Sequence, residues 1–141
     1  MPDISPGAIA AIAAEAARLA SERWRGEIEV WDKEPDHPVS DVDLLVDDFL
    51  REQLGALDPD AGYLSEETTD SSARLGKSRI WLVDPIDGTR DFIRGRAGWC
   101  VSVALIEDGQ PIVAALEAPS RGERWMATAG EGATRNGEPL S

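Results

Sequence analysis

Two aspartates, Asp84 and Asp87, directly follow a short apolar run at residues 80–83 that predicts a buried strand. The proline between them fixes its own φ angle, and the glycine after them tolerates a tight turn. Both carboxylates and the Thr89 hydroxyl can therefore converge at a strand end, where α/β folds place ligands. Oxygen-only ligands suit Mg²⁺, which is commonly shared with a substrate phosphate. The segment predicts a magnesium and phosphate site, against the alternative that both aspartates are ordinary turn residues.

The charge balance narrows the classes of partner. The 141 residues include 27 acidic and 14 basic side chains, for a formal net charge of −13. This charge disfavours unaided binding to nucleic acid or to anionic membranes. Carboxylates that first collect divalent cations can still bind a phosphate. We expect one domain with a hydrophobic core.

Cysteine use and hydropathy predict a cytoplasmic protein. Cys100 is the only cysteine, so no internal disulfide can form and a reducing compartment is expected. The N-terminal residues lack the basic region of a signal peptide, and no apolar run approaches the ~20 residues of a membrane helix.

The apolar pattern predicts a helix that Ser5 caps, that begins at Pro6 and that stops near Gly26. Its apolar stripe comprises Ile9, Ile12, Ala13, Ala16, Leu19 and Ala20. A short β-like piece at residues 27–31 and a polar loop at residues 32–38 are expected to follow.

A second helix is predicted from about Asp41 to Leu54, with Ser40 as its cap and Asp43 completing a capping box. Its apolar face comprises Val42, Leu45, Val46, Phe49, Leu50 and Leu54. The capping box alone explains Asp43 without any metal.

Beyond a Gly-, Asp- and Ser-rich stretch at residues 55–79, the pattern becomes that of β-strands separated by tight turns. The expected strands are residues 80–83, 101–106, 112–117 and 124–128. The predicted class is α+β, with two helices packed on an antiparallel sheet.

Two further acidic residues, Glu66 and Glu67, end a short apolar piece and precede the aspartate pair. Alone they would be interpreted as a solvated surface. Phosphatases of the haloacid dehalogenase type also carry aspartates after a strand, in a D-x-D-G-T motif. Here two residues rather than one separate Asp84 from Asp87, so the side chains cannot take the same relative positions.

Four segments together resemble the inositol monophosphatase superfamily. The segment 81–89, Trp-Leu-Val-Asp-Pro-Ile-Asp-Gly-Thr, is similar to the family signature W-x-[IV]-D-P-[IL]-D-G-T. Residues 64–67 resemble its upstream acidic motif, residues 38–43 its P-V-T-x-x-D element, and residues 130–137 its G-x-G-A-x-x-N-G. All four occur in the family order, over nearly the whole chain.

The resemblance implies two or three Mg²⁺ ions. Glu66, Asp84 and the Ile86 carbonyl would hold the first ion, and Asp84 would bridge to a second ion that Asp87 also binds. Asp43 would complete the cluster directly or through water, alongside its role in the capping box.

The resemblance also implies roles in catalysis and phosphate binding. Glu66 and Thr89, with Asp43, would position and deprotonate the attacking water. Asp87 and the backbone amides of Gly88 and Thr89 would hold the phosphate, together with Lys33. With no nucleophile evident, direct in-line hydrolysis of a phosphate monoester is expected. Inhibition by lithium is a further expectation.

The resemblance stops short of the whole family fold. The later W-D-x-A motif is absent, so residues 1–141 are expected to form the N-terminal, metal-binding half of a layered α/β/α/β/α sugar-phosphatase fold. We expect a partial chain. The alternative is a natural half-domain that binds metal or a partner without turnover.

The substrate prediction rests on residues 89–93, Thr-Arg-Asp-Phe-Ile, which resemble the T-[KR]-[ED]-F-[IV] of 3'(2'),5'-bisphosphate nucleotidases. We therefore expect hydrolysis of 3'-phosphoadenosine 5'-phosphate, with inositol monophosphate as the alternative. Histidinol phosphate and sugar bisphosphates stay open. The expected partner is a small phosphorylated metabolite, and a homodimer is a further expectation.

Overall fold

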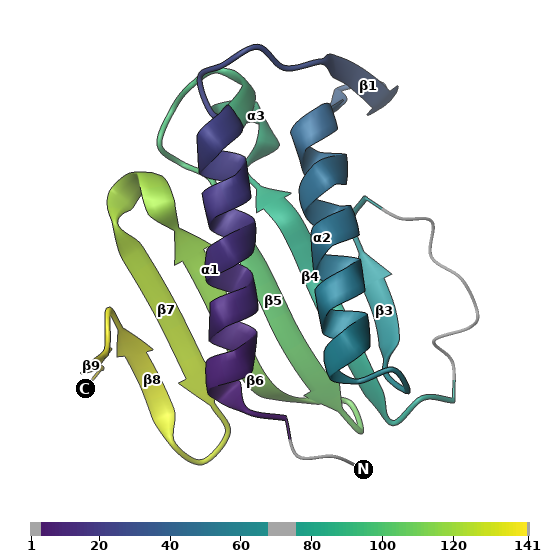
Figure 1. Ribbon diagram of the computed structural model, residues 1–141, viewed down its shortest axis with the longest axis vertical. Coiled ribbons are helices and arrows are strands. Elements are labelled where there is room, and N and C mark those ends of the chain that lie inside the picture. The colour runs from purple at the N-terminus through teal and green to yellow at the C-terminus, as the bar shows by residue number, and fades with distance from the viewer. Residues whose placement is uncertain (1–3, 68–75, 141) are drawn as a thin grey trace.

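Two long helices lie side by side on one face of a seven-stranded sheet (Figure 1). The computed structural model describes residues 4–67 and 76–140. The helices are α1 (Pro6–Arg23), α2 (Asp41–Leu57) and the short α3 (Thr89–Ile93), and η2 (Pro119–Arg121) is a 3₁₀ turn. A separate hairpin contains β1 (Val30–Glu34) and β2 (His37–Ser40). The sheet contains, in spatial order, β3 (Gly62–Ser65), β4 (Arg79–Asp87), β5 (Cys100–Glu107), β6 (Gln110–Ala118), β7 (Glu123–Thr128), β8 (Gly132–Arg135) and β9 (Glu138–Pro139).

The sheet is antiparallel except for one pair of strands. β3 and β4 run parallel, with Gly62 opposite Ile80 and Ser65 opposite Val83. A parallel pair needs a long connection, and residues 66–78 provide one, of which 68–75 lie outside the described residues. The predicted α+β class is confirmed, but the sheet is mixed rather than wholly antiparallel.

Helix α1 begins as predicted, with the Ser5 hydroxyl accepting a hydrogen bond from the Ala8 backbone N–H. Its buried residues are Ile9, Ala13, Ala16, Ala17 and Ala20. Because four of the five are alanines, the helix can pack closely on the sheet. Ile12 and Leu19, predicted on the same stripe, are half-buried at its margin.

Helix α2 extends to Leu57, three residues beyond the prediction, and it has the predicted capping box. Val42, Val46, Leu50 and Leu54 face the core with a spacing of four residues. Leu45, predicted among them, is instead 41% exposed, because it lies to one side of this row.

The predicted loop at residues 32–38 is wrong, because these residues belong to the β1–β2 hairpin. Asp36 makes the turn with a φ of 63°, a left-handed conformation that aspartate tolerates. Every residue of β1 is exposed, so no alternation of polar and apolar residues marks it in the sequence.

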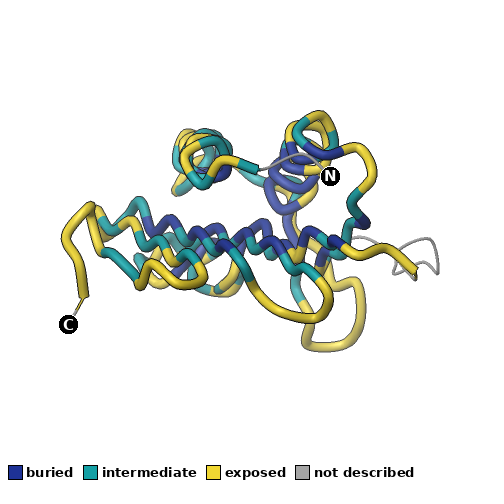
Figure 2. Tube along the Cα trace, turned by 90° about the horizontal axis from the view of Figure 1, so that it is seen from below, coloured by how far each residue is buried: buried dark blue, intermediate teal, exposed yellow. Residues whose placement is uncertain are grey.

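The face of the sheet opposite the helices is largely uncovered (Figure 2). Leu82 on β4 is 45% exposed there. A shallow hollow of about 230 Å³, which includes Leu116, Trp125 and Ala127 in its lining, lies on β6 and β7. Within the described part of the chain, no helix combines the length and apolarity needed to span a membrane.

Candidate active site

A β-bulge positions the two aspartates of the D-P-I-D segment. Asp84 pairs with Ser102 and Asp87 with Cys100, so Pro85 and Ile86 together stand opposite the single residue Val101. Residues three apart on a regular strand point to opposite faces, and one extra residue brings them to the same side. Both aspartates consequently line one cavity. The strand was expected to end at Val83, but it runs to Asp87, because a bulge accommodates a proline that cannot donate to the ladder.

Gly88 turns the chain from β4 into α3. Its φ of 89° is left-handed, and a Cβ at this position would lie 2.7 Å from the Gly98 carbonyl oxygen. Only glycine fits both restrictions. Gly88 caps α3, and its carbonyl accepts a hydrogen bond of 3.0 Å from the Phe92 N–H. The helix that follows Gly88 has only five residues.

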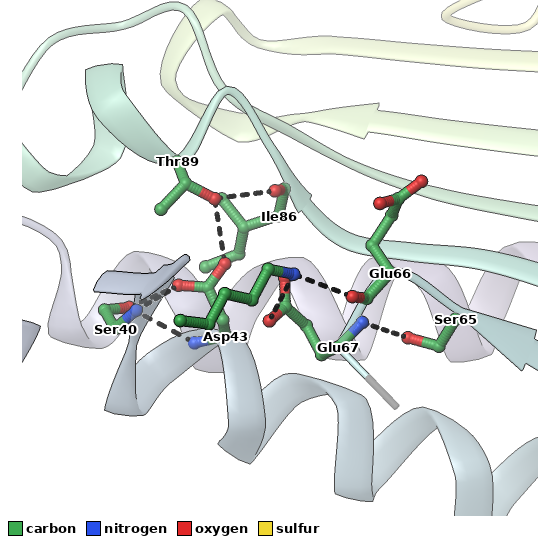
Figure 3. Close-up of polar contacts among 8 residues, drawn as sticks. Ser40, Asp43, Ser65, Glu66, Glu67, Ile86 and Thr89 are labelled. Atoms are coloured by element: carbon green, nitrogen blue, oxygen red, sulfur yellow. Dashed lines mark hydrogen bonds and ion pairs between the residues drawn. The ribbon is translucent and has the colours of Figure 1, made fainter. Parts of the chain in front are cut away.

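Thr89 connects the β4 turn to the buried Asp43 of α2 (Figure 3). Its hydroxyl lies 2.9 Å from Asp43 Oδ1 and 3.1 Å from the Ile86 carbonyl oxygen. The other Asp43 oxygen accepts hydrogen bonds from the Ser40 N–H at 2.8 Å and the Ser40 hydroxyl at 2.6 Å. Asp43 is fully buried, so in this geometry it acts on the cavity through Thr89. Direct ligation of a metal by Asp43 stays a prediction.

Lys33 brings the β1–β2 hairpin to the acidic segment after β3. Its ammonium donates a hydrogen bond of 2.8 Å to the Glu66 carbonyl and lies 3.6 Å from the Glu67 carboxylate. The Glu67 side chain is only 6% exposed, and burial and the charge of Asp43 raise its pKa against the opposing effect of Lys33. Glu66 is exposed, and its carboxylate points away from Asp43 and Glu67 (Figure 3).

A cavity of about 780 Å³ contains most of the predicted site. The predicted residues in its lining are Lys33, Glu66, Asp84, Ile86, Asp87, Gly88 and Thr89. Asp43 is the one predicted residue that lies beneath the lining rather than in it. The structure therefore brings together residues from β1, α2, the end of β3, β4 and α3.

The electrostatics of the cavity favour a cation. Burial, followed by the charges of Asp87, Glu66, Glu67 and Asp43, raises the pKa of Asp84 from 3.8 to about 7. Like charges held this closely destabilise the ionised form of Asp84. A divalent ion between the carboxylates would relieve that repulsion.

The donor set fits Mg²⁺ better than zinc. Asp84, Asp87, Glu66 and the Ile86 carbonyl offer oxygen only, the chemistry that Mg²⁺ prefers. Among the described residues, no three carboxylate, histidine or cysteine side chains already form a closed ligand cluster. Because Glu66 is exposed, its carboxylate is free to rotate towards the two aspartates.

Sequence reasoning missed several residues around this cavity. Glu67 is the more buried of the two glutamates, although metal binding and catalysis were predicted for Glu66. Cys100 is not isolated, because the β4–β5 ladder places its thiol 3.8 Å from Asp87 Oδ2. His37, Arg90 and Arg94 also line the cavity. Only the pairing of the strands could have placed Cys100 beside the aspartate.

Comparison with known proteins shows which family the chain resembles. The model of the inositol monophosphatase family matches residues 3–141. The chain belongs to the inositol monophosphatase family. It is 45% identical over 103 residues to a histidinol-phosphatase of Mycobacterium tuberculosis, a match that covers 72% of this chain and 39% of that protein.

Two further matches agree with this placement in the inositol monophosphatase family. The chain is 39% identical over 106 residues to the 3'(2'),5'-bisphosphate nucleotidase CysQ of Aggregatibacter actinomycetemcomitans, over 74% of this chain and 39% of that protein. The extragenic suppressor protein SuhB of Bartonella henselae superposes with a TM-score of 0.89 at 26% identity, over 95% of this chain and 52% of that one. The chain thus spans about half or less of the length of these relatives.

Proposed function

We propose that the protein carrying this sequence is a Mg²⁺-dependent phosphatase that hydrolyses the monoester of a small phosphorylated metabolite. The observation that carries the proposal is the bulge that brings Asp84 and Asp87 into one cavity, above the hydrogen bond between Thr89 and Asp43. Members of the inositol monophosphatase family use Mg²⁺. Asp84, Asp87, Glu66 and the Ile86 carbonyl would hold the metal here.

Thr89 and Asp43 would act on the attacking water, and the metal would act on the ester. Bound Mg²⁺ would neutralise the ester and lower the pKa of a bound water. The Thr89 hydroxyl donates its proton to Asp43 or to the Ile86 carbonyl, so its own lone pairs are free to accept a hydrogen bond from the attacking water. The buried negative charge of Asp43 then favours removal of a proton from that water through Thr89.

The activity is tested on the full-length protein with and without Mg²⁺. Asp84→Asn and Asp87→Asn each remove a ligand charge, and each is expected to lower kcat by roughly 10³ or more while leaving the fold intact. Asp48→Asn on the exposed side of α2 makes the same change outside the cavity and should leave kcat unchanged. An Asp87→Asn variant with half the wild-type rate would contradict the assigned site.

For the substrate we propose 3'-phosphoadenosine 5'-phosphate. Residues 89–93 resemble the corresponding segment of the bisphosphate nucleotidases, and CysQ is among the relatives. A specific observation also favours histidinol phosphate as a second candidate, since a histidinol-phosphatase is 45% identical to this chain. Inositol monophosphate is the third. A nucleic acid or a membrane is not expected as partner of so acidic a chain, and the homodimer stays a prediction.

The ratio of kcat/KM values on these three esters at saturating Mg²⁺ decides between them. We expect the bisphosphate nucleotide to be preferred. A tenfold preference for either other ester, about 1.4 kcal/mol of transition-state stabilisation, would overturn this ordering. Absence of hydrolysis of all three esters, together with absence of Mg²⁺ binding in a calorimetric titration, would overturn the phosphatase itself.

A further inference from the structure

The cavity, of about 780 Å³, is much larger than a single phosphate group requires. Most of its acidic side chains and its two arginines come from different elements of the fold. The acidic residues Glu66, Glu67, Asp84 and Asp87 come from the ends of β3 and β4. Arg90 and Arg94 come from α3 and its C-terminal cap. Thr89 begins α3 and Arg94 caps its C-terminal end, so the backbone advances by roughly 7 Å between them.

Most of the cationic groups in the lining already have partners. Lys33 binds the Glu66 carbonyl and pairs with Glu67. Arg90 donates to the Asp36 carbonyl at the turn of the β1–β2 hairpin. Arg94, by contrast, has no hydrogen bond or ion pair from its guanidinium to any residue within 4–67 or 76–140.

The acidic residue nearest to Arg94 in sequence on α3 does not neutralise it. Asp91 directs its carboxylate against Gly98, where a Cβ would lie 2.1 Å from Asp91 Oδ2. No ion pair forms between Asp91 and Arg94 in the described structure, although residues three apart on a helix can meet. The Arg94 side chain is exposed, so its guanidinium is a cation at the cavity wall that no described residue pairs with.

We propose that Arg94 binds a second anionic group of the substrate, a phosphate or a carboxylate, while the carboxylate end of the cavity holds the phosphate that is hydrolysed. The inference rests on the proposed phosphatase function and specifies its substrate class. Guanidinium groups bind phosphate and carboxylate through two parallel hydrogen bonds. A substrate with a cationic end, such as the amine of histidinol phosphate, would be repelled at the same place.

The test compares two ligands that differ only by the second phosphate, 3'-phosphoadenosine 5'-phosphate and adenosine 3'-phosphate. In the full-length protein, Arg94→Gln is expected to raise KM for the bisphosphate by roughly tenfold or more, the worth of a hydrogen bond to a charged group. Its kcat should stay unchanged, because the contact is far from the reacting phosphate. The KM for adenosine 3'-phosphate should change by less than about twofold.

Arg96→Gln is the matched control, since Arg96 is an exposed arginine two residues away that does not line the cavity. Arg94→Lys should restore part of the bisphosphate affinity.

Equal effects of Arg94→Gln on both nucleotides, or no effect on either, would overturn the inference. If the wild-type protein hydrolyses no ester, the phosphatase proposal fails, and calorimetric binding of the two nucleotides in the presence of Mg²⁺ still decides the role of Arg94. Weaker binding of the bisphosphate alone to Arg94→Gln supports the inference, and identical binding to Arg94→Gln and Arg96→Gln rejects it.

Discussion

The Cys100 thiol donates a hydrogen bond to the Asp87 carboxylate across the β4–β5 ladder, with 3.8 Å between sulfur and oxygen. The lone cysteine of the chain therefore lies beside a residue of the proposed metal site. Burial, followed by the charges of Asp87 and Asp84, raises the pKa of this thiol to about 11.

This contact predicts how Cys100 reacts. At pH 8 the thiol is protonated, so alkylation by iodoacetamide should be slow. Asp87→Asn removes one negative neighbour and should move the midpoint of the alkylation–pH profile down, although not to the ordinary value, since burial is the larger cause. Asp48→Asn should not move it. An unchanged profile in Asp87→Asn would contradict the contact. Cys100→Ser should leave activity near the wild-type value.

The raised pKa of Asp84 predicts a pH-dependent effect of the metal on stability. In the metal-free protein, the folded state holds the Asp84 proton up to about pH 7, whereas the unfolded state releases it near pH 4. The contribution of this group to stability is therefore fully present below pH 4 and is lost as pH rises towards 7. Because Mg²⁺ relieves the repulsion, the rise in Tm that Mg²⁺ produces should be larger at pH 8 than at pH 5.

Thermal unfolding in EDTA and in Mg²⁺ across this pH range measures the effect. Asp84→Asn should raise the Tm of the metal-free protein at pH 8 and abolish most of the shift produced by Mg²⁺. A shift that is equal at both pH values would contradict the raised pKa of Asp84.

The hydrogen bond between Thr89 and Asp43 predicts a sharp difference between two variants. Thr89→Ala removes the hydroxyl that orients the water and should lower kcat by roughly 10² or more. Thr89→Ser retains the hydroxyl and should retain most of the activity. Thr89→Ser should unfold at the wild-type temperature, whereas Thr89→Ala removes a hydrogen bond from the buried Asp43 and should unfold at a lower temperature. Similar kcat values for the alanine and serine variants would exclude a role for the hydroxyl.

Oxygen-only ligands predict the metal preference. Mg²⁺ or Mn²⁺ should support activity, and Ca²⁺ should inhibit it, because Ca²⁺ prefers more ligands at longer distances. Calorimetric titration of the full-length protein with each ion, followed by activity measurements, checks this order. Tight binding of zinc with no binding of Mg²⁺ would contradict it.

Gly88 is expected to be the least replaceable residue of the turn. Gly88→Ala combines a left-handed φ with a Cβ only 2.7 Å from the Gly98 carbonyl oxygen, so it should destabilise the fold by about 1–3 kcal/mol and lower activity. Gly55→Ala, in α2 with open space around its Cβ, is the control and should be neutral or stabilising. Chemical denaturation measures both.

The sequence predicted those parts of the molecule whose signals are local. Ser40 and Asp43 form a capping box because cap, spacing and acid all lie within four residues. The exposed position of Leu45 was missed because the apolar pattern of α2 is broader than the row that contacts the sheet.

The parts that could not be predicted depend on contacts between distant segments. Lys33 meets Glu67, and Cys100 meets Asp87, only because the hairpin and the β4–β5 ladder bring them together. The parallel pairing of β3 with β4 has no local signature, since period-two patterning does not give the direction of a neighbouring strand. The signature segment located the site in the sequence. It did not predict the contacts that Lys33 and Cys100 make with the acidic residues.

The bulge at Pro85 and Ile86 has a consequence for insertions and deletions. Removing one of the two residues would leave Asp84 and the second aspartate two positions apart, and so still on the same face of a regular strand. If the deleted residue is Ile86, the Thr89 hydroxyl also loses the carbonyl that it meets at 3.1 Å. The extra residue therefore supplies a main-chain oxygen between two carboxylates. A D-x-D version of this strand would keep both acids on one face, with one main-chain oxygen fewer between them.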